Sequence, residues 1–512
     1  MKFLGTSSRA EQGEAWNGAA FDLARRARNG RRVQPELARA LGDWNRRLGA
    51  SPRAMDRLLA LEEGRGFTVI SGQQPALLGG PLFTLYKLLS TCALAEALEA
   101  RFSCPVLPIF WLVSDDSDFG EVSSAWLPDA DGRAVQIRDE EAPEKGALIG
   151  RLAVDRQRRA VTASRAVFDL YPNGAGTRTL LEEALAAGQD WTETVAALLF
   201  RLVPDGGFAV IDGAQPALLD AARPFLLEAR ARWPIEALLE QGASEARARG
   251  FEPALERDLA ARVLFRLENQ RRRGLDPGED PAAGTVGPNV VLRPVLQDWL
   301  FPNLATVCGP SEVRYRAQLG PLYGAADLPE PLRPSRLHAA LLPPLGERQV
   351  DWEQMVEQPE TYVARAVEGA LERRYLEAID ATRGSVSASL ARLTETLRDL
   401  DPSLVQLAES SAGKIDFQVQ RLLDGVRGKA RHRLGQREPL ILALKDWLRP
   451  REREQERIFT LSLPHMVEGG EAITALMRGA RAEVDRRLDS PLDDECSLVF
   501  ELDDAPRKGT SG

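Results

Sequence analysis

The chain has 512 residues, of which 44% are hydrophobic and 28% charged, and its 66 basic and 75 acidic side chains give a net charge of -9. This composition is typical of a globular protein with two or more units and argues against intrinsic disorder. The acidic balance argues against a large nucleic-acid-binding surface. No apolar run approaches the ~20 residues of a membrane span, and the N-terminus lacks the apolar segment of a secretory signal. We therefore expect a cytoplasmic protein without a nucleic-acid or membrane partner.

The cysteines and histidines give little support for a metal centre. The four cysteines contain no C-x-x-C pair, and His338, His432 and His465 are far apart in the sequence. Because the ligands of structural zinc sites are usually close in sequence, we predict no sequence-local zinc site. Scattered thiols fit a reducing cytoplasm, and we interpret each cysteine as a small buried apolar residue.

Residues 1–60 are predicted to form an N-terminal helical segment, after which the pattern becomes that of an α/β core. Residues 67–71 are apolar and β-branched and predict a buried strand, and a helical spacing of apolar residues follows over 82–100. A second apolar run predicts a strand over 106–113. Strand, helix and strand within about 45 residues are typical of a βαβ unit, which places ligands at the strand C-termini of a parallel sheet.

The core is expected to span residues 61–340, with insertions at about 128–190 and 225–285. A strand is predicted at 208–211, and the residues that continue from it, 210–219, repeat 69–78 at eight of ten positions. We attribute the repeat to the shared geometry of strand-to-helix turns, which favours Gly and Pro, rather than to duplication.

Later in the core, further elements are predicted. The run 289–293 is a candidate strand that ends at Pro294, and 304–308 is a strand that leads into a helix near Ser311. The segment 327–344 is rich in proline and is predicted to be a connector.

Residues 341–457 are predicted to form a coiled-coil helical hairpin. Apolar residues from Leu376 to Leu400 alternate spacings of three and four, interrupted only by Arg383, which is a heptad pattern. Asp401-Pro402 can start a second helix. Both a helical pair packed on itself and a projecting arm that forms a homodimer fit this pattern. Residues 458–512 are expected to return to the core.

The strongest local feature for chemistry is the turn-rich segment 72–87. The helix that begins near Pro81 would offer free N–H groups and a positive dipole end to an anion, and the glutamines before it can donate and accept hydrogen bonds. A plain strand-to-helix turn with a solvated lysine fits equally well. The candidate residues of this segment are Gly72, Gln73, Gln74 and Lys87.

An acidic loop after the second predicted strand carries Asp115, Asp116, Asp118 and Glu121. Crowded carboxylates at a strand C-terminus suit an ammonium group, a Mg²⁺ ion or a general base. We interpret Asp118 and Glu121 as functional, whereas a capping role for the first two remains open; Asp116 is retained as a binding candidate.

A third group of candidates follows the strand predicted at 304–308. Gly309, Ser311 and Tyr315 lie at the start of the next helix, and Asn289 and Arg293 are weaker candidates just before it. No phosphate loop, G-x-G-x-x-G fingerprint or nucleophile elbow occurs in the chain. The basic stretch 421–457 leaves open a second nucleotide site, although charge runs are usually solvated helix faces.

Several runs resemble motifs of the bacillithiol biosynthesis cysteine-adding enzymes, the BshC family. They are Ser71-Gly72-Gln73-Gln74, 80–87, Pro108-Ile109-Phe110-Trp111 with its acidic continuation, 292–294, 301–302, 309–312, 317–319 and 455–457. The similarity follows the same order over nearly the whole chain, which makes it more specific than any one motif.

The resemblance implies a Rossmann-type nucleotidyltransferase core like that of class I aminoacyl-tRNA synthetases, with connective insertions and a coiled-coil arm that dimerises the protein. It implies a ligase that joins L-cysteine to glucosaminyl-malate to form bacillithiol, and by analogy with ligases it implies ATP with Mg²⁺. Gln73, Gln74 and Lys87 would then hold substrate or nucleotide anions, and Asp118 and Glu121 would hold an ammonium group or take a proton. We count Lys87 with these two carboxylates as a catalytic candidate.

Two departures from the family pattern concern the proton acceptor. Family members usually carry a histidine where this chain has Ser117, and often another where it has Tyr86. A base at this place would have to be Asp118 or Glu121.

Two other functions remain open from the sequence. One is a different amino-acid-activating enzyme related to the class I synthetases, and the other is a non-catalytic assembly protein on a degenerate enzyme core. Whether activation would pass through an acyl-adenylate or an acyl-phosphate is also open.

Overall fold

The computed structural model describes residues 1–9, 17–275, 278–344, 350–369, 373–437, 439–489 and 495–503. The chain divides into two compact units. We call residues 1–347 with 453–512 the core unit, and residues 348–452 the hairpin unit. In the described residues, no helix is both long and apolar enough to cross a lipid bilayer.

The core unit is built on a parallel sheet with the strand order β10-β2-β3-β6. The strands are β2 (Phe67–Gln73), β3 (Val106–Leu112), β6 (Ala209–Asp212) and β10 (Asn303–Thr306). The chain adds β2, β3 and β6 in one direction and then returns to place β10 on the other side of β2. This reversal is a topological switch point, and open parallel sheets bind ligands outside the strand C-termini at such points.

Helices cover both faces of this sheet, which explains why its strands are almost continuously apolar. On one face, Ile70, Ile109 and Ile211 pack in a cluster with residues of several helices. Those helices include α2 (Pro35–Leu48), α3 (Pro52–Glu62), α10 (Pro216–Arg232) and α12 (Leu292–Leu300). On the other face lies α4 (Leu82–Phe102), where Thr91 donates a hydrogen bond of 2.7 Å to Ser71 of β2. The sequence predictions for these strands and for α4 are confirmed.

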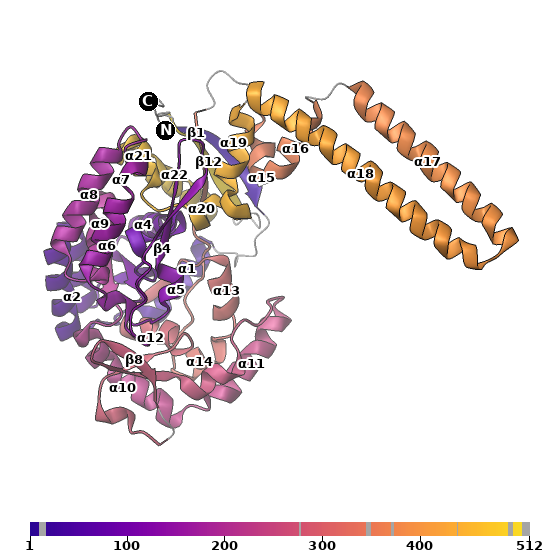
Figure 1. Cartoon of the computed structure of the whole chain (residues 1–512). Helices are drawn as coiled ribbons and strands as arrows, with labels where there is room; N and C mark the ends of the chain where they lie inside the picture. The colour runs from indigo at the N-terminus through magenta and orange to yellow at the C-terminus, as the bar shows by residue number, and fades with distance from the viewer. Residues whose placement is uncertain are drawn as a thin grey trace. The chain divides into compact units, whose positions relative to one another are not determined.

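The remaining elements of the core unit surround this sheet. Before β6 lie α1 (Gly18–Arg28), α5 (Phe119–Val122), β4 (Ser124–Pro128), β5 (Ala134–Arg138), α6 (Val154–Ala163), α7 (Arg165–Phe168), α8 (Gly174–Ala187) and α9 (Trp191–Leu202). After it lie α11 (Ile235–Ala248), β7 (Leu264–Glu268), β8 (Arg271–Gly274), β9 (Val286–Pro288), α13 (Pro310–Arg316), α14 (Gly320–Ala325), α20 (Gln455–Ile458), α21 (Leu463–Glu468) and α22 (Gly470–Asp489). Figure 1 shows α6, α7, α8 and α9 grouped together, and α22 packs on α4.

Two sequence predictions for the core unit are wrong, and a third, the N-terminal helical segment, holds for α1, α2 and α3 but not for its first residues. The candidate strand at 289–293 is a turn and the start of α12, because the Asn289 side chain accepts hydrogen bonds from the N–H groups of Val291 and Leu292. The connector at 327–344 contains β11 (His338–Leu342), and the N-terminal segment begins with a strand, β1 (Lys2–Arg9). These two strands belong to a sheet with the order β1-β12-β11, completed by β12 (Glu495–Glu501) (Figure 1).

The hairpin unit confirms the predicted pair of long helices. Its helices are α15 (Trp352–Glu357), α16 (Pro359–Gly369), α17 (Arg373–Leu400), α18 (Ser403–Arg437) and α19 (Pro439–Leu448). Figure 1 shows α17 and α18 running side by side from a tight turn. The heptad pattern predicted from Leu376 to Leu400 is wrong at two positions. Leu393 and Leu400 are 50% and 76% exposed, whereas the neighbouring Thr394 is half-buried.

Candidate functional site

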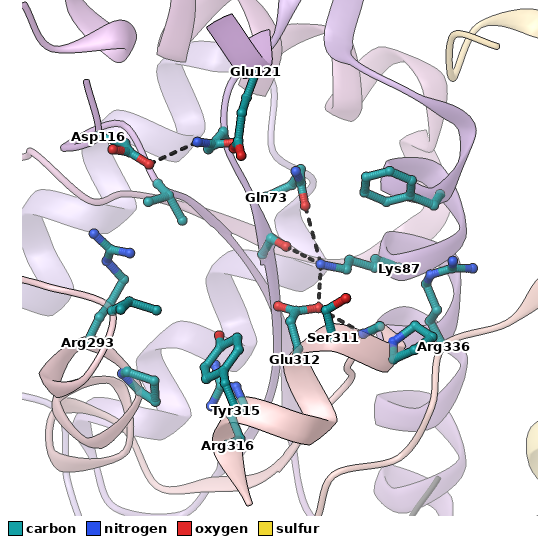
Figure 2. Close-up of a pocket in the computed structure, with 18 of the residues that line it drawn as sticks. Gln73, Lys87, Asp116, Glu121, Arg293, Ser311, Glu312, Tyr315, Arg316 and Arg336 are labelled. Carbon is teal, nitrogen blue, oxygen red and sulfur yellow. Dashed lines mark hydrogen bonds and ion pairs between the residues drawn. The ribbon is translucent and has the colours of Figure 1, made fainter. Parts of the chain in front are cut away.

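A cavity of about 490 Å³ lies at the switch point of the parallel sheet. Its walls include Gly72 and Gln73 at the end of β2, Val113 after β3, and Gly309 after β10. Since parallel strands end on the same edge of a sheet, segments far apart in the sequence meet here. The cavity thus occupies the position that this topology favours for a ligand (Figure 2).

Lys87 of α4 lies in the middle of this cavity wall and is held by three acceptors. Its Nζ lies 2.8 Å from the carbonyl oxygen of Gly72, 3.3 Å from Oε1 of Gln73 and 2.6 Å from Oε2 of Glu312 (Figure 2). Glu312 also accepts the N–H of Gly309 at 2.8 Å. Lys87 therefore ties the end of β2 to the start of α13 across the switch point.

Glu312 remains ionised in this arrangement. Burial acts to raise the pKa of its carboxyl group, but the charges of Lys87 and Arg316 outweigh burial and hold the pKa below its ordinary value. Two ion-paired groups of opposite sign inside a shielded wall attract each other more strongly than they would in water. The ion pair of Lys87 and Glu312 therefore forms a fixed polar part of the cavity wall.

The first two carboxylates of the acidic loop are paired with arginines. Asp115 accepts a hydrogen bond of 3.0 Å from Arg293 at the start of α12. Asp116 accepts one of 3.0 Å from Arg272 of β8 and one of 2.9 Å from Gln74. Burial acts to raise the pKa of Asp116, but the charge of Arg272 and the hydrogen bond from Gln74 keep it below its ordinary value. Both carboxylates are therefore counterions of arginines.

The two outer carboxylates of the loop, Asp118 and Glu121, were both predicted to be functional, but only one of them lines the cavity. Glu121 is exposed and lines the cavity, as Figure 2 shows. Asp118 is exposed too, but it caps α5 by accepting the N–H of Glu121 at 3.4 Å and does not line the cavity. Asn289 is buried as the cap of α12 and lies outside the lining as well.

The other predicted candidates come together in this cavity. They are Gly72, Gln73, Gln74, Lys87, Asp116, Glu121, Arg293, Gly309, Ser311 and Tyr315. Sequence reasoning missed Phe83, Glu312, Arg316, Arg336 and Arg457, which also line it. The Gly-Pro-Ser-Glu run carried a signal for Glu312, and the family-like run 455–457 carried one for Arg457, whereas Arg336 falls in the supposed connector.

The charges of the lining favour a ligand with negative groups. Five basic side chains, from Lys87, Arg293, Arg316, Arg336 and Arg457, line the cavity with the carboxylates of Asp116, Glu121 and Glu312. Asp115 and Glu456, outside the lining, pair with Arg293 and Arg336. Arginine forks match carboxylate and phosphate geometry, so this set suits either group.

Proton transfer in this cavity depends on carboxylates. No histidine lines it in the described part of the chain, and burial raises the pKa of Tyr315 to about 12, which keeps its hydroxyl protonated at neutral pH. Of the three carboxylates in the lining, Glu121 alone is exposed. Glu121 can therefore accept a proton or hold an ammonium group.

Comparison with known proteins gives matches over most of the chain. The model of the family "Bacillithiol biosynthesis BshC, N-terminal Rossmann-like domain" matches residues 7–282 and 280–336, and that of its C-terminal coiled-coil domain matches 342–481. Similar proteins named "Putative cysteine ligase BshC" include one from Solibacter usitatus, 26% identical over 81% of this chain and 82% of its own length. Another, from Shouchella clausii, is 27% identical over 85% of this chain and 86% of its own length.

Proposed function

This chain belongs to the BshC family of bacillithiol biosynthesis, and from that premise we propose that it is the ligase that joins L-cysteine to glucosaminyl-malate. The observation that carries the proposal is the cavity at the switch point of the sheet, with five basic side chains and one exposed carboxylate in its lining. Those groups match the charges of a reaction that activates one carboxylate and then lets an amine attack it.

We further propose that the reaction uses ATP. A carboxylate does not condense with an amine until one of its oxygens becomes part of a better leaving group, such as an adenylate or a phosphate. The amine then forms the new C–N bond, the phosphate-bearing group leaves with that oxygen, and the amine loses a proton. Basic side chains and N–H donors stabilise the negative charge that develops on the acyl and phosphate oxygens.

Two arginines of the lining each carry a buried donor without an acceptor. The Nε atoms of Arg293 and Arg316 are buried and have no hydrogen-bond partner among the described residues, although both side chains line the cavity. A buried donor without an acceptor costs free energy, and an anionic ligand would recover it only if the arginine side chain turned to expose its Nε–H.

The expected Mg²⁺ would depend on the nucleotide. In the described residues, no three His, Cys, Asp or Glu side chains gather as a metal site. Mg²⁺ is commonly bound by substrate phosphates with one or two carboxylates, and it would supply charge neutralisation. Asp116 is occupied by Arg272 and Gln74, so Glu121 is the residue that fits such a contact.

Glu121 is also our candidate for receiving the proton of the attacking amine. Glu121 lines the cavity, whereas the side chain of Asp118 caps α5. With Ser117 in the place of a family histidine, an exposed carboxylate is the remaining acceptor in this loop.

The test combines purified protein with L-cysteine, glucosaminyl-malate, ATP and Mg²⁺, and follows bacillithiol by mass spectrometry. We expect product that disappears when ATP is omitted. Glu121→Gln should lower the rate by about 100-fold, the usual scale for a general base, and Asp118→Asn should change it little. Pyrophosphate exchange with a different amino acid, without bacillithiol, would instead indicate another amino-acid-activating enzyme.

We also propose that two copies associate through the hairpin unit. Leucines on α17 and α18 remain exposed after the two helices have packed on each other: Leu393, Leu400, Leu407 and Leu422. Exposed apolar side chains that recur along a helical pair are typical of an association surface.

A further inference from the structure

Arg336 enters the cavity wall from a segment that runs parallel to β10 and its continuation, where the Arg336 N–H donates to the carbonyl of Cys308 at 2.9 Å. Its side chain is 2% exposed, yet it lines the cavity beside Gly309 and Phe83. Its guanidinium carbon lies 5.6 Å from the centre of the Phe83 ring. A buried arginine is costly unless its charge is paired, so its partners decide what it can do.

Glu456 of α20 is that partner. Its two carboxylate oxygens accept hydrogen bonds of 2.9 and 2.5 Å from Nη1 and Nη2 of Arg336, and Nη1 also donates to the carbonyl of Leu337 at 3.0 Å. Nδ1 of His338 lies 3.1 Å from the same carboxylate, which is 4% exposed. A bidentate pair of this kind fixes the plane of the guanidinium group as well as its position.

The ion pair with Glu456 leaves the Nε–H edge of the Arg336 guanidinium group unused. The terminal nitrogens are turned to Glu456, whereas Nε has no hydrogen-bond partner among the described residues. Nε lies 3.9 Å from the point where a side chain on Gly309 would begin, and Gly309 itself lines the cavity. The Nε–H edge is therefore a donor beside Gly309 in the cavity wall, where Oε2 of Glu312 and Cε of Lys87 lie 3.5 and 4.0 Å from the same point.

The backbone that carries Glu456 is itself anchored to the core. The side chain of Gln455 accepts from the N–H of Leu341 and donates to its carbonyl, both at 3.0 Å, as a neighbouring strand would. The carbonyl of Phe459 accepts the N–H of Leu82, the first residue of α4, at 2.7 Å. Support on both sides gives Glu456 a fixed place from which to orient Arg336.

We propose that Arg336 binds an oxyanion of the ligand through its Nε–H edge and that Glu456 is the positioning residue that orients it. The inference rests on the proposed function, which supplies two sources of such an oxyanion. One is a phosphate of ATP, and the other is a carboxylate of the malate group. Both have the oxygen acceptors that an arginine donor requires.

The test measures binding of ATP and of L-malate separately, by titration calorimetry on the full chain without turnover. Arg336→Met and Glu456→Gln should each weaken one of these probes by about tenfold, the scale of one charge-assisted hydrogen bond, and leave the other unchanged. Weaker ATP binding assigns the phosphate, and weaker malate binding assigns the carboxylate. Because Glu456 acts through Arg336, Glu456→Gln should add no further loss in the Arg336→Met background.

A matched control removes the same kind of ion pair elsewhere. Arg57 is 3% exposed and donates to Glu99 at 2.8 Å, and neither residue lines the cavity, so Glu99→Gln should leave both affinities unchanged. Glu456→Asp retains the charge and serves if Glu456→Gln does not fold; it should weaken the same probe as Arg336→Met.

Three results would overturn the inference: unchanged binding in Arg336→Met, an equal loss in Glu99→Gln, or a wild-type chain that binds neither probe. The proposed function fails in a different way. Binding that depends on Arg336 and Glu456 without any bacillithiol product would leave this inference standing and reject the ligase reaction.

Discussion

Asp115 and Arg293 form the pair at which the energetics of single residues can be tested most directly. The Asp115 side chain is 3% exposed and that of Arg293 is 13% exposed, and they are 3.0 Å apart. Removal of one member leaves a buried charge without a counterion, so Asp115→Ala should destabilise the core unit by about 3–5 kcal/mol. The measurement is urea denaturation followed by tryptophan fluorescence, with Glu252→Ala, at an exposed loop carboxylate, as a control expected to stay within about 0.5 kcal/mol.

A double variant tests whether the loss of stability in Asp115→Ala comes from the broken ion pair. If the cost of Asp115→Ala comes from the unpaired guanidinium, then Arg293→Met in the same chain should restore much of the stability. A double variant whose loss equals the sum of the single losses would show that the two residues act independently.

Asp190 provides a pH-dependent test. It caps α9 and accepts a hydrogen bond of 2.9 Å from Arg151, but burial raises its pKa from the ordinary 3.8 to about 6. The folded chain thus binds this proton more tightly than the unfolded chain, and the contribution of Asp190 to stability falls as pH rises from about 4 to 6. The two pKa values differ by about two units, which sets an upper limit of about 3 kcal/mol.

We expect Asp190→Asn, which keeps a capping side chain and cannot ionise, to remove this pH dependence. Relative to that variant, the wild-type chain should be more stable at pH 4 than at pH 7 when both are unfolded with urea. A stability difference that is constant over this range, or that grows in favour of wild type as pH rises, would contradict the assignment.

The residues of the cavity show which parts of a site are predictable from sequence. Gln73, Lys87 and Gly309 lie next to strands and turns whose local patterns are clear, and the topology of parallel strands brings these segments together. Arg336 and Glu456 lack such a pattern. Their meeting depends on contacts such as that of Gln455 with Leu341, which join segments more than 100 residues apart.

At the scale of elements, the turn between β2 and α4 requires glycine for two separate reasons. Gly79 has φ of +83°, a conformation that side chains rarely adopt. A Cβ there would also lie 2.7 Å from Cδ2 of Leu461 and 2.8 Å from Cδ2 of Leu198. Gly79→Ala should therefore destabilise the core unit by about 1–3 kcal/mol through strain and overpacking.

Gly324 of α14 is the control position for Gly79→Ala. It has no positive φ, and no heavy atom lies within 4 Å of its added Cβ, so Gly324→Ala should be neutral or stabilise the chain by up to about 1 kcal/mol. Thermal unfolding of both variants checks the sign. Equal effects of the two substitutions would mean that the geometry at Gly79 is not the cause.

The elements that sequence reasoning misplaced share one property, which is that tertiary contacts override local preference. The run 289–293 has the apolar, β-branched character of a strand, but the side chain of Asn289 caps a helix there and Pro294 fits its first turn. β1 has its hydrogen-bond partners in β12, at the other end of the chain. A pairing over such a distance leaves no periodic pattern in the N-terminal segment itself.

At the scale of the whole molecule, the exposed leucines of the hairpin unit bear on its association. The heptad pattern includes Leu393, but Leu393 and Leu407 are 50% and 64% exposed, while Thr394 is half-buried and Ala408 is buried. The packing of the two helices thus uses a face next to these leucines. A second copy of the chain could bury the leucines in the way that coiled-coil helices bury their apolar positions.

We therefore expect a dimer in solution that the double variant Leu393→Asp, Leu407→Asp converts to a monomer, because carboxylates at these positions would have to be desolvated on association. Size-exclusion chromatography with light scattering gives the mass directly. Leu59→Asp, at a leucine of α3 that is 52% exposed in the core unit, is the control and should leave the mass unchanged. A monomeric wild-type chain would reject the dimer, and a double variant that remains dimeric would place the association elsewhere; either result would leave these leucines as a surface without a partner.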